Sequence, residues 1–198
     1  MPKAKRVPDE QATPYATTAD FGLIFDQDMN SLHLLSFLLT ADEEKAEQCF
    51  VAGLEDSVTG NRVFKEWART WARRAIIKNA VRMMNPRPLK ENGGSNSGSW
   101  NHPETTLPAA PVELAAVLEL APFDRFVFVL SVLERYADHD CSLLLGCSRR
   151  DVLAARARGL QQIASAVESH REQQINTGSE NPVLHDDHSP VFELQTSH

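Results

Sequence analysis

Residues 133–160, which read LERYADHDCSLLLGCSRRDVLAARARGL, constrain the fold of this chain more than any other stretch. Their apolar positions predict two helices, the first over Asp138–Leu145 and the second beginning at Ser148. Gly146 lies between them, where a sharp turn favours a residue without Cβ because the backbone must become left-handed. The Ser148 hydroxyl is suited to accept a hydrogen bond from the first turn of the second helix. The segment therefore predicts a helix-turn-helix, whose second helix typically enters the major groove of DNA.

Cations gather at the start of this second helix. Arg149 and Arg150 follow the cap directly, and guanidinium groups suit both phosphates and guanine edges. Asp151 would repel phosphate, so we expect it to cap its own helix. The alternative for these arginines is a solvated helix face. The residues of this helix expected at DNA are Ser148, Arg149, Arg150, Asp151, Ala154, Arg156 and Arg158.

A second basic segment lies earlier in the chain. Residues 62–90 hold nine basic side chains and one acid, although the formal charge of the whole chain is −7. This asymmetry suggests a localised footprint for a polyanion. The residues expected there are Arg69, Arg73, Arg74, Lys78 and Arg82. An ordinary solvated face or a partner surface is the alternative. The aromatic residues Phe64, Trp67 and Trp71 share one helical stripe, and we expect both tryptophans in the core.

The chain as a whole predicts an all-α protein with two small helical domains joined by a flexible linker, the second domain carrying the helix-turn-helix. Thr40 is expected to cap a helix that has Glu43 at its third position. A helix ends before Pro86, and the polar, glycine-rich stretch after it is typical of a linker. The predicted parts are a disordered arm (1–22), a helical domain (23–85), the linker (86–110), the helix-turn-helix domain (111–170) and a disordered acidic tail (171–198).

The order of these parts resembles a bacterial sigma-70 family RNA polymerase sigma factor of the compact, extracytoplasmic-function type. The C-terminal likeness rests on Leu120, Pro122, Arg125, Val127, Phe128, Leu130, Glu134, Tyr136, the run Leu144-Leu145-Gly146-Cys147-Ser148, and Val152. The N-terminal likeness rests on Phe37-Leu38-Leu39-Thr40-Ala41-Asp42, Ala46-Glu47, Phe64, Trp67 and Ala72-Arg73. Together the resemblance spans residues 30–84 and 111–164.

This resemblance implies a transcription initiation protein that binds core RNA polymerase and promoter DNA, with the chemistry left to the polymerase. The N-terminal domain would hold the −10 element and the helix-turn-helix would bind the −35 element. The clamp of the largest polymerase subunit would contact Asp42, Glu43, Glu47, Gln48 and Val51. An anti-sigma factor is a further partner that the resemblance implies.

Two departures from the family pattern motivate two alternatives. Gln48, Val51 and Ala52 stand where the family carries polar docking residues, which favours a DNA-binding regulator on a sigma-like frame that does not bind polymerase. In the predicted DNA-reading helix, Ala154-Ala155-Arg156 replace the usual Ser-Arg-Leu. That change favours a protein-interaction module that does not touch DNA.

The sequence offers little support for an enzyme, a cofactor or a membrane protein. His139-Asp140-Cys141 has no defined base or oxyanion partner, so we expect Cys141 to be a core thiol. The three cysteines fit buried thiols in a reducing cytoplasm. His185 and His188 in the acidic tail are not expected to hold a metal, because metal sites need ordered supporting groups. No apolar run approaches the roughly 20 residues of a membrane helix, and we expect a cytoplasmic protein.

Overall fold

The computed structural model describes residues 14–88 and 111–177, and the regular elements of these residues are helical, apart from an isolated bridge between Tyr15 and Phe64. The all-α prediction is thus confirmed for this part of the chain. The N-terminal half contains α1 (Thr18–Gln27), α2 (Met29–Thr40), α3 (Glu43–Thr59), the short 3-10 helix η1 (Lys65–Trp67) and α4 (Ala68–Met84). None of the helices in the described ranges is long and apolar enough to cross a membrane.

The C-terminal half begins at Pro111. It contains α5 (Val112–Leu118), α6 (Pro122–Phe128), the π-helical turn η2 (Val129–Leu133), α7 (Asp138–Leu145) and the long α8 (Arg149–Thr177). Pro122 is the first residue of α6, a position where proline is favoured because its missing N–H would have no intrahelical partner. The expected linker residues 89–110 lie outside the described part of the chain.

Small residues on α4 allow α3 and α4 to pack closely. The buried face of α4 consists of Ala68, Ala72, Ala75, Ile76, Ile77 and Ala80. On α3, Gly53 lies so near Ile76 that a Cβ there would be 2.6 Å from Cγ1 of Ile76. The glycine of α3 opposite Ile76, together with the alanines on the buried face of α4, therefore lets the two helices lie close together.

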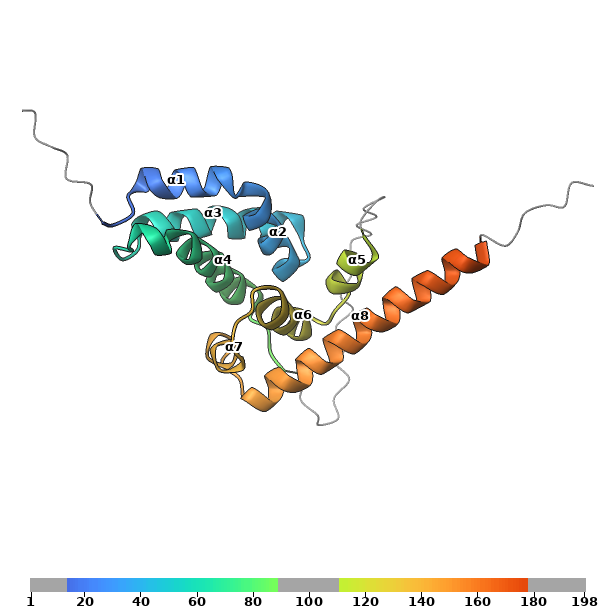
Figure 1. Cartoon of the computed structure of the whole chain (residues 1–198). Coiled ribbons are helices and arrows are strands. Elements are labelled where there is room, and N and C mark those ends of the chain that lie inside the picture. The colour runs from blue at the N-terminus through green and yellow to red at the C-terminus, as the bar shows by residue number, and fades with distance from the viewer. Residues whose placement is uncertain (1–13, 89–110, 178–198) are drawn as a thin grey trace, which may run out of the picture.

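The two halves of the chain pack against each other. One hydrophobic core holds residues of both, including Leu39, Ile76, Phe126 and Val152. In Figure 1 the first four α-helices form one bundle, and α6 and α7 lie at its lower edge. The joining contacts run from α2 to α6 and from α4 to α7. The described residues of the two predicted domains thus share a continuous interior.

The predicted capping role of Thr40 is wrong. Thr40 is the last residue of α2, is buried, and its hydroxyl donates to the backbone oxygens of Ser36 and Asp42. Asp42 caps α3 instead, accepting a 3.0 Å hydrogen bond from the backbone N–H of Lys45. Ala41 adopts the left-handed conformation between the two helices. Two polar residues, Thr40 and Asp42, could serve as the cap, and the start of α3 lies two residues later than predicted.

Three further expectations need correction. Helix α1 begins at Thr18 with Thr17 and Asp20 in a capping box, so residues 18–22 are not a disordered arm. Helix α8 continues to Thr177, seven residues into the expected tail. Trp67 is 59% exposed and not a core residue, because the chain enters α4 through η1 and the buried stripe begins at Ala68. The rest of the predicted arm (1–13) and tail (178–198) lies outside the described residues.

Candidate functional site

The turn between α7 and α8 has the local geometry that the sequence predicts. Helix α7 runs over Asp138–Leu145, and Gly146 follows with φ of 62°. The Ser148 hydroxyl accepts a 3.2 Å hydrogen bond from the backbone N–H of Asp151. The Asp151 carboxylate accepts in return from the backbone N–H and the hydroxyl of Ser148. These bonds hold the pKa of Asp151 below its ordinary value, so Asp151 serves the cap as a carboxylate.

Helix α8 exposes two cations immediately after this cap. Arg149 and Arg150 are both exposed, and neither forms an ion pair with another residue in the described ranges. On the same outward side lie Ala154 and Leu153, the latter 48% exposed, while Val152 faces the core. The exposed end of α8 therefore combines guanidinium groups with apolar side chains.

The other two predicted arginines of α8 bind carboxylates of the same chain. Arg156 donates to both carboxylate oxygens of Asp138, at the start of α7. Arg158 donates to both oxygens of Asp124, at 2.9 and 2.7 Å. Asp124 is buried, so the second pair fixes α8 against α6. Of the four predicted arginines of α8, Arg149 and Arg150 are thus exposed. Arg156 and Arg158 instead form ion pairs within the C-terminal half.

The predicted cations of α4 are distributed in the same way. Arg69 donates to Asp28 and Gln27, and Arg82 donates to Asp56 and Asn79. Arg73 donates to Glu134 of the C-terminal half. Arg74 and Lys78 are exposed. Because three of the five predicted cations of α4 are paired with acids, its free cationic surface is smaller than its number of basic residues suggests.

Arg74 and Lys78 line a pocket of about 360 Å³ between α4 and the end of α3. The ammonium of Lys78 lies 5.6 Å from the centre of the Trp71 ring, which also lines the pocket. Near the start of α4, the half-buried Tyr15 and the exposed Phe64 and Trp67 form a row of rings, with ring centres 4.9 and 5.4 Å apart. Exposed aromatic rings beside cations are suited to stack unpaired bases. The prediction of a core position is wrong for Trp67, and Trp71 is only half-buried.

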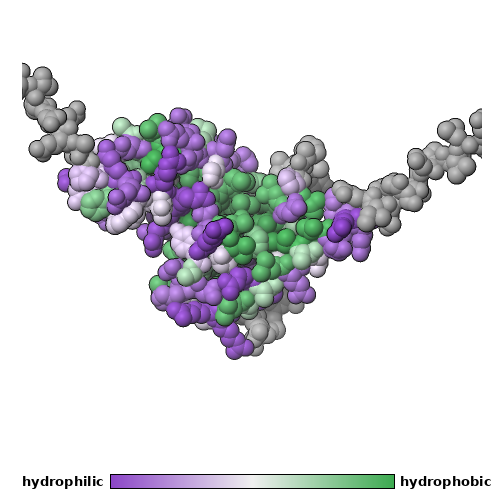
Figure 2. Space-filling view, in the orientation of Figure 1, coloured by the Kyte–Doolittle hydropathy of each residue, from purple (hydrophilic) through white to green (hydrophobic). Residues whose placement is uncertain are grey.

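An apolar groove of about 740 Å³ lies between α2, α3 and α5. Its lining is Met29, Asn30, His33, Leu34 and Phe37 of α2, Glu43, Glu47, Phe50 and Val51 of α3, and Leu114 of α5. Figure 2 shows hydrophobic surface gathered over α5 and α6, next to α2. Three of the residues expected to bind polymerase, Glu43, Glu47 and Val51, thus lie in one groove. Met29 and Leu34, which also line the groove, were not among the predicted residues. Both lie outside the buried stripe of α2 and are exposed.

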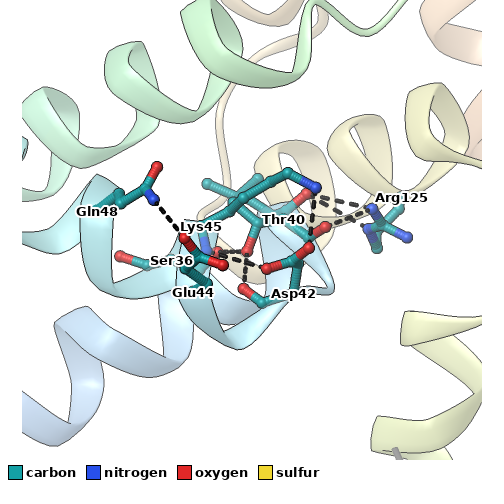
Figure 3. A network of polar contacts seen from close by, with 8 residues as sticks. Ser36, Thr40, Asp42, Glu44, Lys45, Gln48 and Arg125 are labelled. Carbon is teal, nitrogen blue, oxygen red and sulfur yellow. Dashed lines mark hydrogen bonds and ion pairs between the residues drawn. The ribbon is translucent and has the colours of Figure 1, made fainter. Parts of the chain in front are cut away.

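The other two residues of that expected set make contacts inside the chain. Asp42 caps α3 and forms a 2.8 Å ion pair with Lys45. Gln48 donates a 3.2 Å hydrogen bond to Glu44. Figure 3 shows these residues along α3, beside the end of α2 that Arg125 reaches. Asp42 and Gln48 therefore shape the helix next to the groove without lining it.

Two of the three cysteines are buried as expected, whereas Cys147 is only partly buried. Cys49 and Cys141 are fully buried, and burial raises the pKa of each thiol to about 11. Such thiols stay protonated near neutral pH and are poor nucleophiles, in keeping with the prediction of a core thiol at Cys141. In the described residues, no three His, Cys, Asp or Glu side chains gather as a metal site would need. His185 and His188 lie outside these residues.

No protein-family model matches the chain, and no curated protein matches it.

Proposed function

We propose that this chain is a sigma-70-like transcription initiation protein, which binds core RNA polymerase and selects promoter DNA. The N-terminal end of α8 reads the −35 element in duplex DNA. Helix α4 and the aromatic row beside it engage the −10 element. The groove between α2, α3 and α5 docks on the clamp of the largest polymerase subunit. The resemblance in sequence supplies these assignments, and the geometry of each surface supports them.

The observation that carries the proposal is the exposed pair Arg149 and Arg150 at the start of α8. A helix that begins at a tight glycine turn projects its first residues away from the helix before it, which lets them enter a major groove. The backbone N–H groups at a helix start also favour phosphate. Arg149 and Arg150 are open to solvent at this point, where guanidinium groups are able to contact phosphates and guanine edges.

The next exposed positions of α8 fit the same use. Leu153 and Ala154 lie on the outer side of the helix within a turn of the arginines. Apolar side chains in the major groove contact the methyl group of thymine, which distinguishes thymine from cytosine. Arg156 and Arg158 are assigned to the scaffold in this proposal, because both bind carboxylates within the chain. The DNA-reading surface is therefore confined to the first two turns of α8.

The groove fits a helical partner with apolar and basic side chains. Met29 and Val51 are 50% and 48% exposed, which is high for large apolar residues. Glu43 and Glu47 add negative charge to the same lining. An apolar groove with an acidic rim binds an amphipathic helix by burying its apolar face, while the charges set its orientation. In this proposal that helix belongs to the polymerase clamp.

Paired variants of the full chain test the DNA-binding role. Arg149→Ala with Arg150→Ala is compared with Arg171→Ala and Arg87→Ala, two exposed arginines whose loss changes the net charge equally. Binding to a library of duplex promoter fragments is measured as a function of salt concentration. We expect the first pair to lose at least about tenfold in affinity and to lower the salt dependence by about two phosphate contacts. An equal effect of both pairs would contradict DNA reading by α8, and no effect of the Arg149 and Arg150 changes on any activity would favour the protein-interaction module.

The second candidate is a DNA-binding regulator that does not bind polymerase. The internal contacts of Asp42 and Gln48 favour it, because these two side chains are used within α3. Co-purification with core RNA polymerase separates the two candidates. A chain that binds duplex DNA without forming a complex with polymerase is the regulator.

A further inference from the structure

Helix α8 extends beyond the core that it helps to form. Within the described residues, Ile163 is the last residue of α8 that packs against the hydrophobic core, yet the helix continues to Thr177. In Figure 1 this far end of α8 projects past the other helices. A single helix of a few turns is marginal in water, because most helices in proteins are stabilised by an apolar face that packs on another element. The described residues do not supply that packing for the far end of α8.

An apolar stripe runs along the outer side of α8. Leu153, Leu160 and Val167 recur every seven residues, and Ala157 and Ala164 lie between them with the same period. Leu153 and Leu160 are 48% and 47% exposed, both alanines are exposed, and Val167 is half-buried. A seven-residue apolar repeat is the pattern by which two helices pair along their length. We name these five residues the α8 stripe.

The proposed DNA-reading surface accounts for only one end of the α8 stripe. That surface is confined to the first two turns of α8 and includes Leu153. Leu160, Ala164 and Val167 lie further along the helix. Apolar side chains that gather on one exposed face mark a contact with another protein. The greater part of the α8 stripe therefore fits an occupant other than duplex DNA.

The sizes of the side chains in the α8 stripe favour a second copy of α8 in antiparallel orientation. When two such helices run in opposite directions, Leu160 faces Ala157 of the second copy and Leu153 faces its Ala164. Each large side chain then lies opposite a small one, and the two-fold axis repeats both contacts. In a parallel pair, alanine would face alanine and leave a gap at alternate layers. The α8 stripe is therefore complementary to itself in one direction only.

The charges beside the α8 stripe favour the same direction. Arg150 lies near the start of the helix, and Glu168 lies on the same flank about five turns later. Both side chains are exposed, and neither forms an ion pair with another of the described residues. An antiparallel pair brings Arg150 next to Glu168 of the second copy at both ends, whereas a parallel pair brings each charge next to its like. Charge and size therefore agree on the antiparallel arrangement.

We propose that the chain forms a symmetric dimer in which two copies of α8 pair antiparallel through the α8 stripe. Leu160 and Ala157 lie next to the two-fold axis, and Arg150 pairs with Glu168 of the second copy at each end. Arg150 and Leu153 also belong to the proposed DNA-reading surface, so a second copy and a DNA duplex exclude each other there. The dimer does not depend on the proposed function, because its contacts need no nucleic acid.

Sedimentation velocity of the full chain, from about 1 to about 100 µM, tests the dimer. We expect a dimer whose population rises with concentration. Leu160→Glu should weaken it at least about tenfold, because the pairing would bury an unpaired charge. Gln162→Glu adds the same charge at an exposed position on another face of α8 and should change it by less than about twofold. A chain that stays monomeric overturns the proposal, and so does a dimer that Leu160→Glu leaves intact.

A second pair of variants tests the packing of large against small side chains. Ala164→Leu adds apolar surface but places a large side chain opposite Leu153 of the second copy, so we expect the dimer to weaken by about tenfold. Ser165→Leu adds a similar side chain at an exposed position outside the α8 stripe and is the control. A dimer that Ala164→Leu strengthens would show general apolar association and would overturn the proposed packing.

Charge reversal tests the direction of the pair. Arg150→Glu and Glu168→Arg should each weaken the dimer by about fivefold, because each brings like charges together at both ends. The double variant has the net charge of the unchanged chain and should regain its affinity to within about twofold. Losses that simply add in the double variant would overturn the antiparallel arrangement.

Spin labels measure the same direction as a distance between the two copies. Single labels are placed at Gln161→Cys, near the two-fold axis, or at Glu172→Cys, near the far end of α8, both exposed positions, with Cys147→Ser. Cys49 and Cys141 are buried and stay unlabelled. The helical rise predicts less than about 20 Å between the Gln161→Cys labels and about 40 Å between the Glu172→Cys labels. Short distances at both positions indicate a parallel pair and overturn the proposal.

Discussion

The guanidinium of Arg125 donates a 3.2 Å hydrogen bond to the backbone oxygen of Thr40, which lies 85 residues earlier in the chain. It also donates to the backbone oxygens of Leu118 and Leu120 at 3.1 and 3.2 Å. Arg125 is buried, and no carboxylate of the described residues pairs with it. Burial lowers its pKa to about 10, so the group is still charged at neutral pH. The carbonyl end of α2, where the helix dipole is negative, stabilises this charge.

Removing this guanidinium should destabilise the contact between the halves. Arg125→Met leaves several buried carbonyl groups without a donor, and we expect the free energy of unfolding to fall by about 3 kcal/mol. Urea denaturation measures the change. Arg150→Met, a change at an exposed position, is the control and should cost less than about 0.5 kcal/mol. Equal stability of the two variants would contradict the role of Arg125 in joining the halves.

The contact between α3 and α4 predicts opposite effects for two glycine substitutions. Gly53→Ala places a Cβ 2.6 Å from Ile76 Cγ1 and 3.3 Å from the Ile76 backbone nitrogen, so the helices must move apart. We expect a loss of about 1–3 kcal/mol in the free energy of unfolding. Gly22→Ala in α1 meets nothing within 4 Å and should add about 0.5–1 kcal/mol through helix propensity. Thermal or urea denaturation of both variants checks the pair, and a tolerated Gly53→Ala would refute this close packing.

The buried thiols predict that stability declines at alkaline pH. Burial raises the pKa of Cys49 and Cys141 from 9 to about 11, so the folded chain keeps these protons where the unfolded chain releases them. The contribution is fully present below pH 9 and is lost as the pH rises to about 11. Between these two values the free energy of unfolding of Cys49→Ala should fall by about 2 kcal/mol less than that of the unchanged chain. If the free energy of unfolding of the two proteins fell equally between these pH values, the contribution of the buried Cys49 thiol would be excluded.

The cap of α8 should contribute to the order of the exposed arginines. Ser148→Ala removes the acceptor for the Asp151 N–H and should lower the free energy of unfolding by about 1 kcal/mol. Hydrogen exchange should accelerate in the first turn of α8, at Arg150 and Asp151. Ser165→Ala, an exposed position further along the same helix, is the control and should not lower stability. Unchanged exchange in the first turn of Ser148→Ala would exclude a capping role.

Local signals predicted the turn between α7 and α8 well. Gly146 and Ser148 each have a conformational preference that acts within a few residues, and both lie where the sequence analysis expected them. The same kind of signal failed at Thr40, because Asp42 is an equally good cap two residues later. Local preferences therefore identified the helices more reliably than their boundaries.

Contacts between residues far apart in the chain could not be predicted from the sequence. Arg73 and Glu134 are 61 residues apart, and nothing in the local pattern indicates that they meet. The net charge of residues 62–90 therefore overstated the free cationic surface of α4, since three of its five predicted cations bind acids of the chain. Trp67 was misplaced for a related reason. Whether its stripe faced the core depended on η1, which shifts the start of α4 to Ala68.

Co-purification of the tagged full chain with core RNA polymerase, followed by transcription from a library of promoter fragments, tests the proposed function most directly. Val51→Glu, which adds charge to the apolar groove, serves as the variant, and Glu55→Gln on the same helix serves as the control. The proposed function predicts a stable complex that starts transcription at specific promoters and is lost in Val51→Glu alone. The absence of any complex with the unchanged chain would contradict it.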